Sequence, residues 1–140
     1  MEYTVDYFIG KFSSIPDELW TECYCEWYDK KCAMGHCGTS DFGSMTEESL
    51  ALYDLLKTLS VTYANNKMIS GERVRIAFRT IYSFNDGHIK EYQQPTAKER
   101  ILAALYDVKK MQEAEKPKEI IRYVAVSEKI EEKSKELILN

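Results

Sequence analysis

The sequence predicts a mainly α-helical fold in one compact domain, with one or two short β-strands. Two stretches, 5–12 and 52–59, repeat large apolar residues at intervals of three and four, which is the period of a helix with one buried face. A third stretch, 101–111, does the same after a capping motif. A chain of 140 residues with 44% hydrophobic and 30% charged residues can bury a core without disulfides.

The first predicted helix begins near the N-terminus, with Thr4 as its cap. Its apolar stripe has the spacing i, i+3, i+4, i+7 and consists of Val5, Phe8, Ile9 and Phe12. Pro16 suits the first turn of a second, brief helix, with Ser14 as its cap. The positions four residues apart in that helix are Leu19, Cys23 and Trp27. The segment 21–28 is also rich in residues that favour strands.

The segment 32–38, CAMGHCG, combines cysteines with small residues and is predicted to lie inside the molecule. After a loop at 39–43, Ser44 and Glu47 form a capping box. The helix that follows carries a stripe of leucines, namely Leu52, Leu55, Leu56 and Leu59.

The segment 73–84 fits both periodicities, and its β-branched and aromatic residues favour a strand. The turn Asn85-Asp86-Gly87 ends it, because these residues tolerate positive φ and can bond nearby backbone amides. Thr96 and Glu99 form a second capping box. The stripe of the helix after it consists of Ile101, Leu102, Leu105, Val108 and Met111.

Pro117 separates that helix from a charged C-terminal segment. We therefore expect a globular core over 1–116 and a C-terminal helix over 117–140, docked or partly exposed.

Several of these segments together resemble a family of small uncharacterised proteins of bacteriophages and their bacterial hosts. The matching positions are Trp20, Cys32, Gly35, Asn85, Asp86 and Thr96, within FNDG at 84–87, PTAKERILAALYDV at 95–108 and CAMGHCG at 32–38. The resemblance covers roughly residues 5–110. It implies a phage or prophage origin, and it implies no reaction, cofactor or partner.

The net charge of −4 argues against nucleic acid as the main partner, since phosphate binding needs a clustered excess of Lys and Arg. The one basic cluster is Arg73, Arg75 and Arg79, which reads as a solvated face or a place for an anion. No apolar run is long enough to span a membrane. Glu2 and Asp6 stand where a signal peptide would be basic, so a cytoplasmic protein with reduced thiols is expected.

The stretch 20–38 contains all four cysteines, and its first interpretation is packing, because cysteine is among the most buried residue types. A cysteine-dependent hydrolase is an alternative, with Cys32 as nucleophile, His36 or His88 as base and Asp86 orienting His88. A zinc-stabilised binding module is another alternative. Its ligands would be Cys23, Cys25, Cys32 and Cys37, whose spacing fits only half of the usual pattern.

The interpretation we favour has no cofactor and no catalytic residue. If 32–38 packs against 85–87, a short central helix is held by a polar turn, and the aromatic residues near it, which include Tyr82, form a rim that suits a partner protein. The predicted binding residues are Tyr24, Trp27, Tyr28, Asn85, Asp86 and Tyr92. The expected function is that of a non-enzymatic, phage-type accessory protein that binds another protein or inhibits a host factor.

Overall fold

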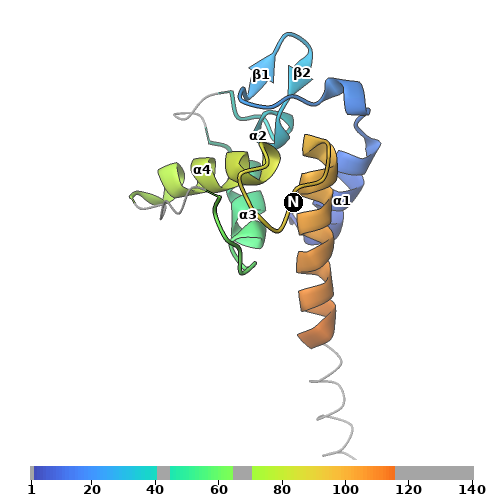
Figure 1. The fold of residues 1–140 in the computed structure, drawn as a ribbon, viewed down its shortest axis with the longest axis vertical. Coiled ribbons are helices and arrows are strands. Elements are labelled where there is room, and N and C mark those ends of the chain that lie inside the picture. Colours follow the sequence, from blue (N-terminus) through green and yellow to red (C-terminus); the bar gives the residue numbers. More distant parts are fainter. Residues whose placement is uncertain (1, 41–44, 65–70, 116–140) are drawn as a thin grey trace, which may run out of the picture. The chain divides into compact units, whose positions relative to one another are not determined.

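The computed structural model describes residues 2–40, 45–64 and 71–115, and its fold is mainly α, as predicted (Figure 1). The elements in chain order are α1 (Val5–Ser14), the 3-10 helix η1 (Asp17–Leu19), β1 (Glu26–Trp27), β2 (Lys30–Lys31), α2 (Ala33–His36), α3 (Glu47–Leu56), α4 (Arg73–Asn85) and a helix over residues 97–115. The chain forms two compact units, Met1–Lys109 and Lys110–Asn140. The predicted C-terminal helix over 117–140, and the boundary proposed before it, lie outside the described residues.

The first unit has one hydrophobic core to which every α-helix of that unit contributes. Its largest fully buried side chains include Phe8, Phe12, Met34, Leu52, Leu56, Ile81, Phe84, Ile89, Ile101, Leu105 and Val108. Burying an aliphatic or aromatic side chain of this size contributes ~2 kcal/mol. The buried side chains therefore hold the helices in place, and the helices position the polar residues described below.

Helix α1 confirms its prediction. The Thr4 side chain accepts a hydrogen bond from the backbone N–H of Tyr7, and Phe8 and Phe12 are buried. On its other side, Lys11 forms an ion pair of 2.9 Å with Glu48 of α3, which also accepts a hydrogen bond from the Tyr7 hydroxyl. These contacts fix α1 to α3.

The strand predicted for 73–84 is wrong, because these residues form α4. The buried positions 77, 80, 81 and 84 have the spacing i, i+3, i+4 and i+7 of one helical face. The alternating residues that suggested a strand do not share one environment, because Phe84 is buried whereas Val74 is exposed. Helix α4 ends as expected at the Asn85-Asp86-Gly87 turn, where Gly87 has φ of +79°.

The helix predicted after Pro16 stops at Leu19, so Cys23 and Trp27 do not share a helical face with it. The chain instead forms a two-residue-per-strand antiparallel hairpin, in which Glu26 pairs with Lys31 and Trp27 with Lys30. Cys23 and Tyr28 both have positive φ, which no helix allows. Among the described residues, the β-sheet consists of these two strands alone.

Threonines cap α3 and the last helix. Thr46 caps α3 by accepting a hydrogen bond from the Ser49 N–H, in place of the predicted Ser44, which lies outside the described residues. Thr96 accepts from the Glu99 N–H at the start of the last helix, as predicted. The apolar stripe of that helix is buried at Ile101, Leu105 and Val108, whereas Met111 is exposed.

Across 2–40, 45–64 and 71–115, no helix combines the length and the apolar character that crossing a membrane requires.

Candidate functional site

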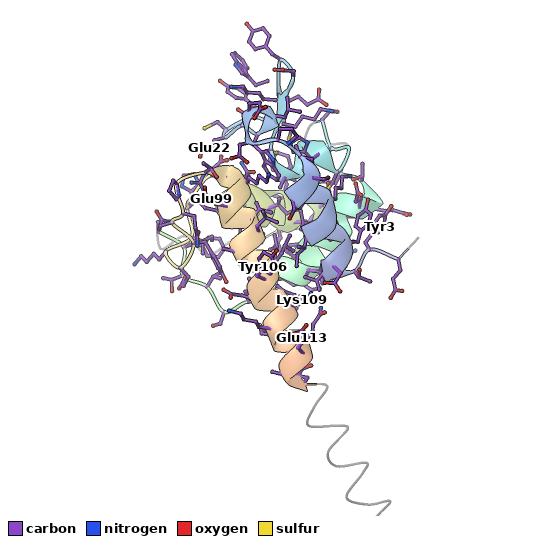
Figure 2. All side chains as sticks on the ribbon, turned by 90° about the vertical axis from the view of Figure 1, so that its right-hand side faces the viewer. Tyr3, Glu22, Glu99, Tyr106, Lys109 and Glu113 are labelled. Carbon is purple, nitrogen blue, oxygen red and sulfur yellow. The ribbon has the colours of Figure 1, made fainter. Side chains whose placement is uncertain are left out.

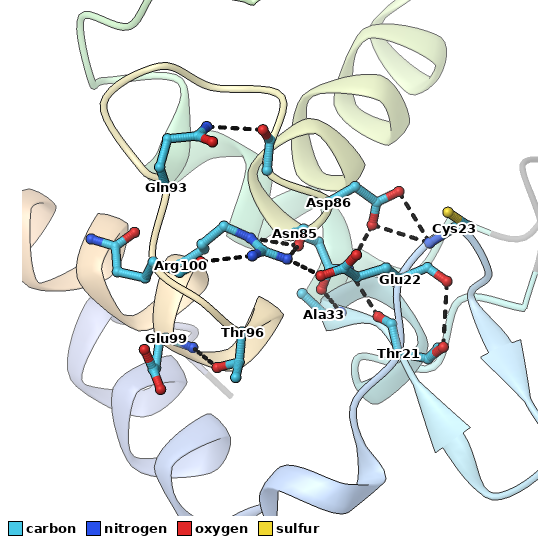
Figure 3. A network of polar contacts seen from close by, with 12 residues as sticks. Thr21, Glu22, Cys23, Ala33, Asn85, Asp86, Gln93, Thr96, Glu99 and Arg100 are labelled. Carbon is cyan, nitrogen blue, oxygen red and sulfur yellow. Dashed lines mark hydrogen bonds and ion pairs between the residues drawn. The ribbon is translucent and has the colours of Figure 1, made fainter.

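Asn85 is the centre of a buried polar network at the end of α4 (Figure 3). Its side-chain oxygen accepts a hydrogen bond of 3.1 Å from the Ala33 N–H at the start of α2. Its side-chain nitrogen donates to the Thr21 carbonyl at 3.0 Å and to the Asp86 carboxylate at 2.8 Å. One amide thus satisfies backbone groups of two other segments. It brings 32–38 against 85–87, the arrangement on which the predicted aromatic rim was made conditional.

Arg100 completes this network and was missed by the sequence analysis. Its guanidinium donates to the Asn85 carbonyl at 2.8 and 3.1 Å and to the Gln94 carbonyl at 2.7 Å, and it forms an ion pair with Glu22. Although charged, Arg100 is only 6% exposed. The available signal was its place four and eight residues before the buried Ala104 and Val108, on the same helical face, because a buried arginine needs several acceptors.

The hairpin carries a cluster of exposed aromatic side chains, the aromatic cap, formed by Tyr24, Trp27 and Tyr28. Their exposed fractions are 52%, 46% and 88%. The Trp27 ring stacks on Tyr24 at 4.7 Å and meets Tyr28 edge to face at 5.0 Å. Figure 2 shows the side chains at the hairpin and, on the last helix, the exposed Tyr106.

Two predicted binding residues are not on this surface. Tyr92 is buried beside Phe84, and its hydroxyl donates to Asp107 at 2.7 Å, so its placement on the aromatic rim is corrected. Asn85 is fully buried and its polar atoms bond the protein itself. Its role in the described structure is to hold α2 and the segment before the hairpin.

A cavity of about 340 Å³ lies beside Tyr24 of the aromatic cap. Its lining consists of Cys23, Tyr24, Cys25, Cys32, Met34, Phe78, Tyr82, Asp86 and His88. The fold therefore brings the alternative catalytic residues Cys32, Asp86 and His88 to one cavity. Asp86 is engaged there, since its carboxylate accepts hydrogen bonds from the Cys23 N–H at 3.1 and 3.2 Å.

The environment of Cys32 opposes its use as a nucleophile. A hydrogen bond with the Cys25 side chain, and then burial, raise the pKa of the Cys32 thiol well above its usual range. A nucleophilic cysteine needs the opposite shift, because the thiolate is the reactive form. His36 does not line the cavity; its Nε2 atom bonds the Leu19 carbonyl at 3.0 Å, and its ring lies 4.8 Å from that of Trp20.

The four proposed zinc ligands do not share one location. Cys23, Cys25 and Cys32 line the cavity, whereas Cys37 is buried elsewhere, and burial followed by the Glu48 charge raises the pKa of its thiol. Within the part of the chain that the structure describes, no three His, Cys, Asp or Glu side chains are grouped as metal ligands would be. The basic residue Arg73 forms an ion pair with Asp54 at 2.9 Å.

His36 gives the protein a pH-dependent stability. Burial lowers the pKa of His36, so the folded state keeps the imidazole neutral while the unfolded chain takes up a proton near pH 6.5. The unfolded state then binds more protons, so the stability from this group is complete above about pH 6.5 and falls as the pH drops below it. We expect the free energy of unfolding of the native chain to decrease more steeply from pH 7 to pH 5 than that of His36→Gln, which keeps a donor for the Leu19 carbonyl. Parallel curves in urea titrations would contradict this prediction.

Comparison of this chain with protein-family models, with curated proteins and with solved structures finds no match.

Proposed function

We propose that this chain is a non-enzymatic accessory protein that binds another protein through the aromatic cap. The observation that supports this is the exposure of three neighbouring aromatic rings on one short hairpin. Tyrosine and tryptophan are the residues most enriched among those that dominate binding energy at protein interfaces. Exposed aromatic clusters of this kind are otherwise unfavourable, because apolar surface is left in water.

The surroundings of the aromatic cap fit the anatomy of an interface. Charged residues lie on the same hairpin, namely Glu26, Asp29, Lys30 and Lys31, and all but the partly exposed Lys31 are exposed. Interfaces typically have an aromatic centre and a polar rim. The mutual stacking of the rings orders them before a partner arrives, which reduces the entropy lost on binding.

The rigid support of the hairpin favours the same function. Asp86 holds the Cys23 N–H at one end, and the Cys32 N–H bonds the Cys25 carbonyl at 3.1 Å at the base. A pre-organised binding surface needs such support from beneath. The raised pKa of Cys32 makes the alternative, a cysteine-dependent hydrolase, the weaker proposal.

The resemblance to phage proteins extends this proposal to a cellular role. A phage-encoded chain would act in the host cytoplasm, and inhibition of a host factor is the role we propose for it there. The charge of −4 agrees with a protein partner and not a nucleic acid.

The test is capture of partners on the immobilised full-length protein from a lysate of the cells that express it. Trp27→Ala and Tyr28→Gly remove rings from the aromatic cap, and glycine suits the positive φ of +56° at position 28. Tyr106→Ala is the matched control, because Tyr106 is 48% exposed on another element. We expect at least about a tenfold loss of the captured protein with the two aromatic-cap variants and no loss with the control. Equal capture by all folded variants would contradict the proposal.

A further inference from the structure

Cys25 and Cys32 are directly opposed across the base of the hairpin. The strand register pairs Glu26 with Lys31, and the hydrogen bond of 3.1 Å from the Cys32 N–H to the Cys25 carbonyl extends the ladder by one position. Opposed residues in an antiparallel ladder have Cα atoms roughly 4.5 to 5.5 Å apart. This separation lies within the range that a disulfide spans.

The two side chains also share one environment. Both line the cavity beside Tyr24, so they lie on the same face of the hairpin. Cys25 is partly exposed and Cys32 is buried. A reagent that enters the cavity from solvent therefore reaches the Cys25 sulfur more readily than the Cys32 sulfur.

We propose that Cys25 and Cys32 form a redox-active dithiol that a small-molecule disulfide oxidises. In the first step the Cys25 thiolate attacks one sulfur of the small disulfide, and the second sulfur leaves as a thiolate that takes a proton. In the second step the Cys32 sulfur, after losing its proton to solvent, attacks Cys25 of the mixed disulfide and expels the remaining thiol. The protein gains one disulfide, and the small disulfide is reduced to two thiols.

The order of the two steps follows from the surroundings of Cys32. Its hydrogen bond to the Cys25 side chain and its burial keep it protonated while Cys25 is reduced. When Cys25 enters the mixed disulfide it is no longer a thiol, so the Cys25 hydrogen bond that raised the pKa of Cys32 is lost. Cys32 then acts as the resolving thiol.

The consequence for the molecule is a covalent link across the base of the hairpin. The link would join the residues on either side of Trp27 and Tyr28, and so would restrict the aromatic cap through its backbone. Cys23 lines the same cavity and is the competing thiol, whereas Cys37 lies outside it.

The experiment exposes the full-length protein to mixtures of oxidised and reduced glutathione, alkylates the remaining thiols and maps the tryptic peptides by mass spectrometry. Trypsin cleaves after Lys11, Lys30, Lys31 and Lys57, so Cys23 and Cys25 are released on one peptide and Cys32 and Cys37 on another. Fragmentation of the linked peptides then identifies which two cysteines are joined. The key variant combines Cys23→Ser with Cys37→Ala, since it keeps only the proposed pair. We expect this variant to lose both thiols as the native chain loses two of its four.

Single variants test the order of the steps. Both are made in the Cys23→Ser, Cys37→Ala background, which lacks the competing thiol. There Cys32→Ser should accumulate glutathione on Cys25, and Cys25→Ser should keep Cys32 as a free thiol. Two retained thiols in the folded double variant under excess oxidised glutathione would overturn the proposal. A native chain linked through Cys23 in place of Cys25 would overturn it as well.

Discussion

Gly35→Ala is expected to lower the free energy of unfolding by ~3 kcal/mol or more. A Cβ at this position would lie 2.0 Å from the Cys25 carbonyl oxygen and 2.9 Å from the Lys31 Cβ. Both are far below ordinary contact distances, and the carbonyl belongs to the backbone at the base of the hairpin. Since Gly35 lies within α2, helix propensity alone would favour alanine by only ~1 kcal/mol. The steric effect therefore decides the sign.

The measurement is urea-induced unfolding followed by circular dichroism. The matched control is Gly10→Ala, because Gly10 is exposed in α1 and a Cβ there would meet no atom within 4 Å. This control should gain ~0.5 to 1 kcal/mol from helix propensity. If Gly35→Ala is as stable as the native chain, the hairpin base does not lie against α2 as described.

Asn85→Ala is expected to cost ~3 kcal/mol. The substitution removes one acceptor and two donated hydrogen bonds from a fully buried position. It leaves the Ala33 N–H and the Thr21 carbonyl without their side-chain partner, and each unsatisfied buried group costs ~1 to 3 kcal/mol. Urea titration of the purified variant gives the value directly.

Gln93→Ala is the control for Asn85→Ala because it removes the same chemical group from an exposed position. The Gln93 amide donates to the Gly87 and Ile89 carbonyls at 2.9 and 2.6 Å. Water can replace these bonds, so the expected loss is below ~1 kcal/mol. Equal losses from Asn85→Ala and Gln93→Ala would show that burial does not strengthen the network around Asn85.

The helices that could be predicted are those in which local signals agree. Helix α1 has both a threonine cap and a complete apolar stripe, and α3 and the last helix have their stripes. In α4 the two periodicities conflict, because Val74, Phe78 and Tyr82 also fit alternation, and only the burial of Ala77 and Ile81 decides for a helix. Tertiary packing overrides local preference at such positions.

The candidate site could be predicted only in part. The burial of 32–38 was predicted from its cysteines and small residues, but its packing against Asn85 entered only as a condition, because turn chemistry at 85–87 does not say which segment the turn meets. The composition of 21–28 favoured a strand as well as a helix, and β1 lies in this segment. The hairpin pairing could not be predicted, because strands of two residues leave almost no pattern, and the positive φ of Cys23 and Tyr28 has no glycine to mark it. Arg100 was missed because its acceptors are backbone carbonyls, which no side-chain motif reveals.

The buried polar network also bears on how the chain reaches its native state during synthesis. Glu22 and Arg100 are separated by 78 positions, and Asn85 and Ala33 by 52. Contacts between such distant positions form late, because the entropy of closing a long loop is lost before they are made. A nascent polypeptide that still ends before Arg100 lacks the guanidinium that joins these segments. The polar network that supports the hairpin is therefore complete only after most of the chain has been translated.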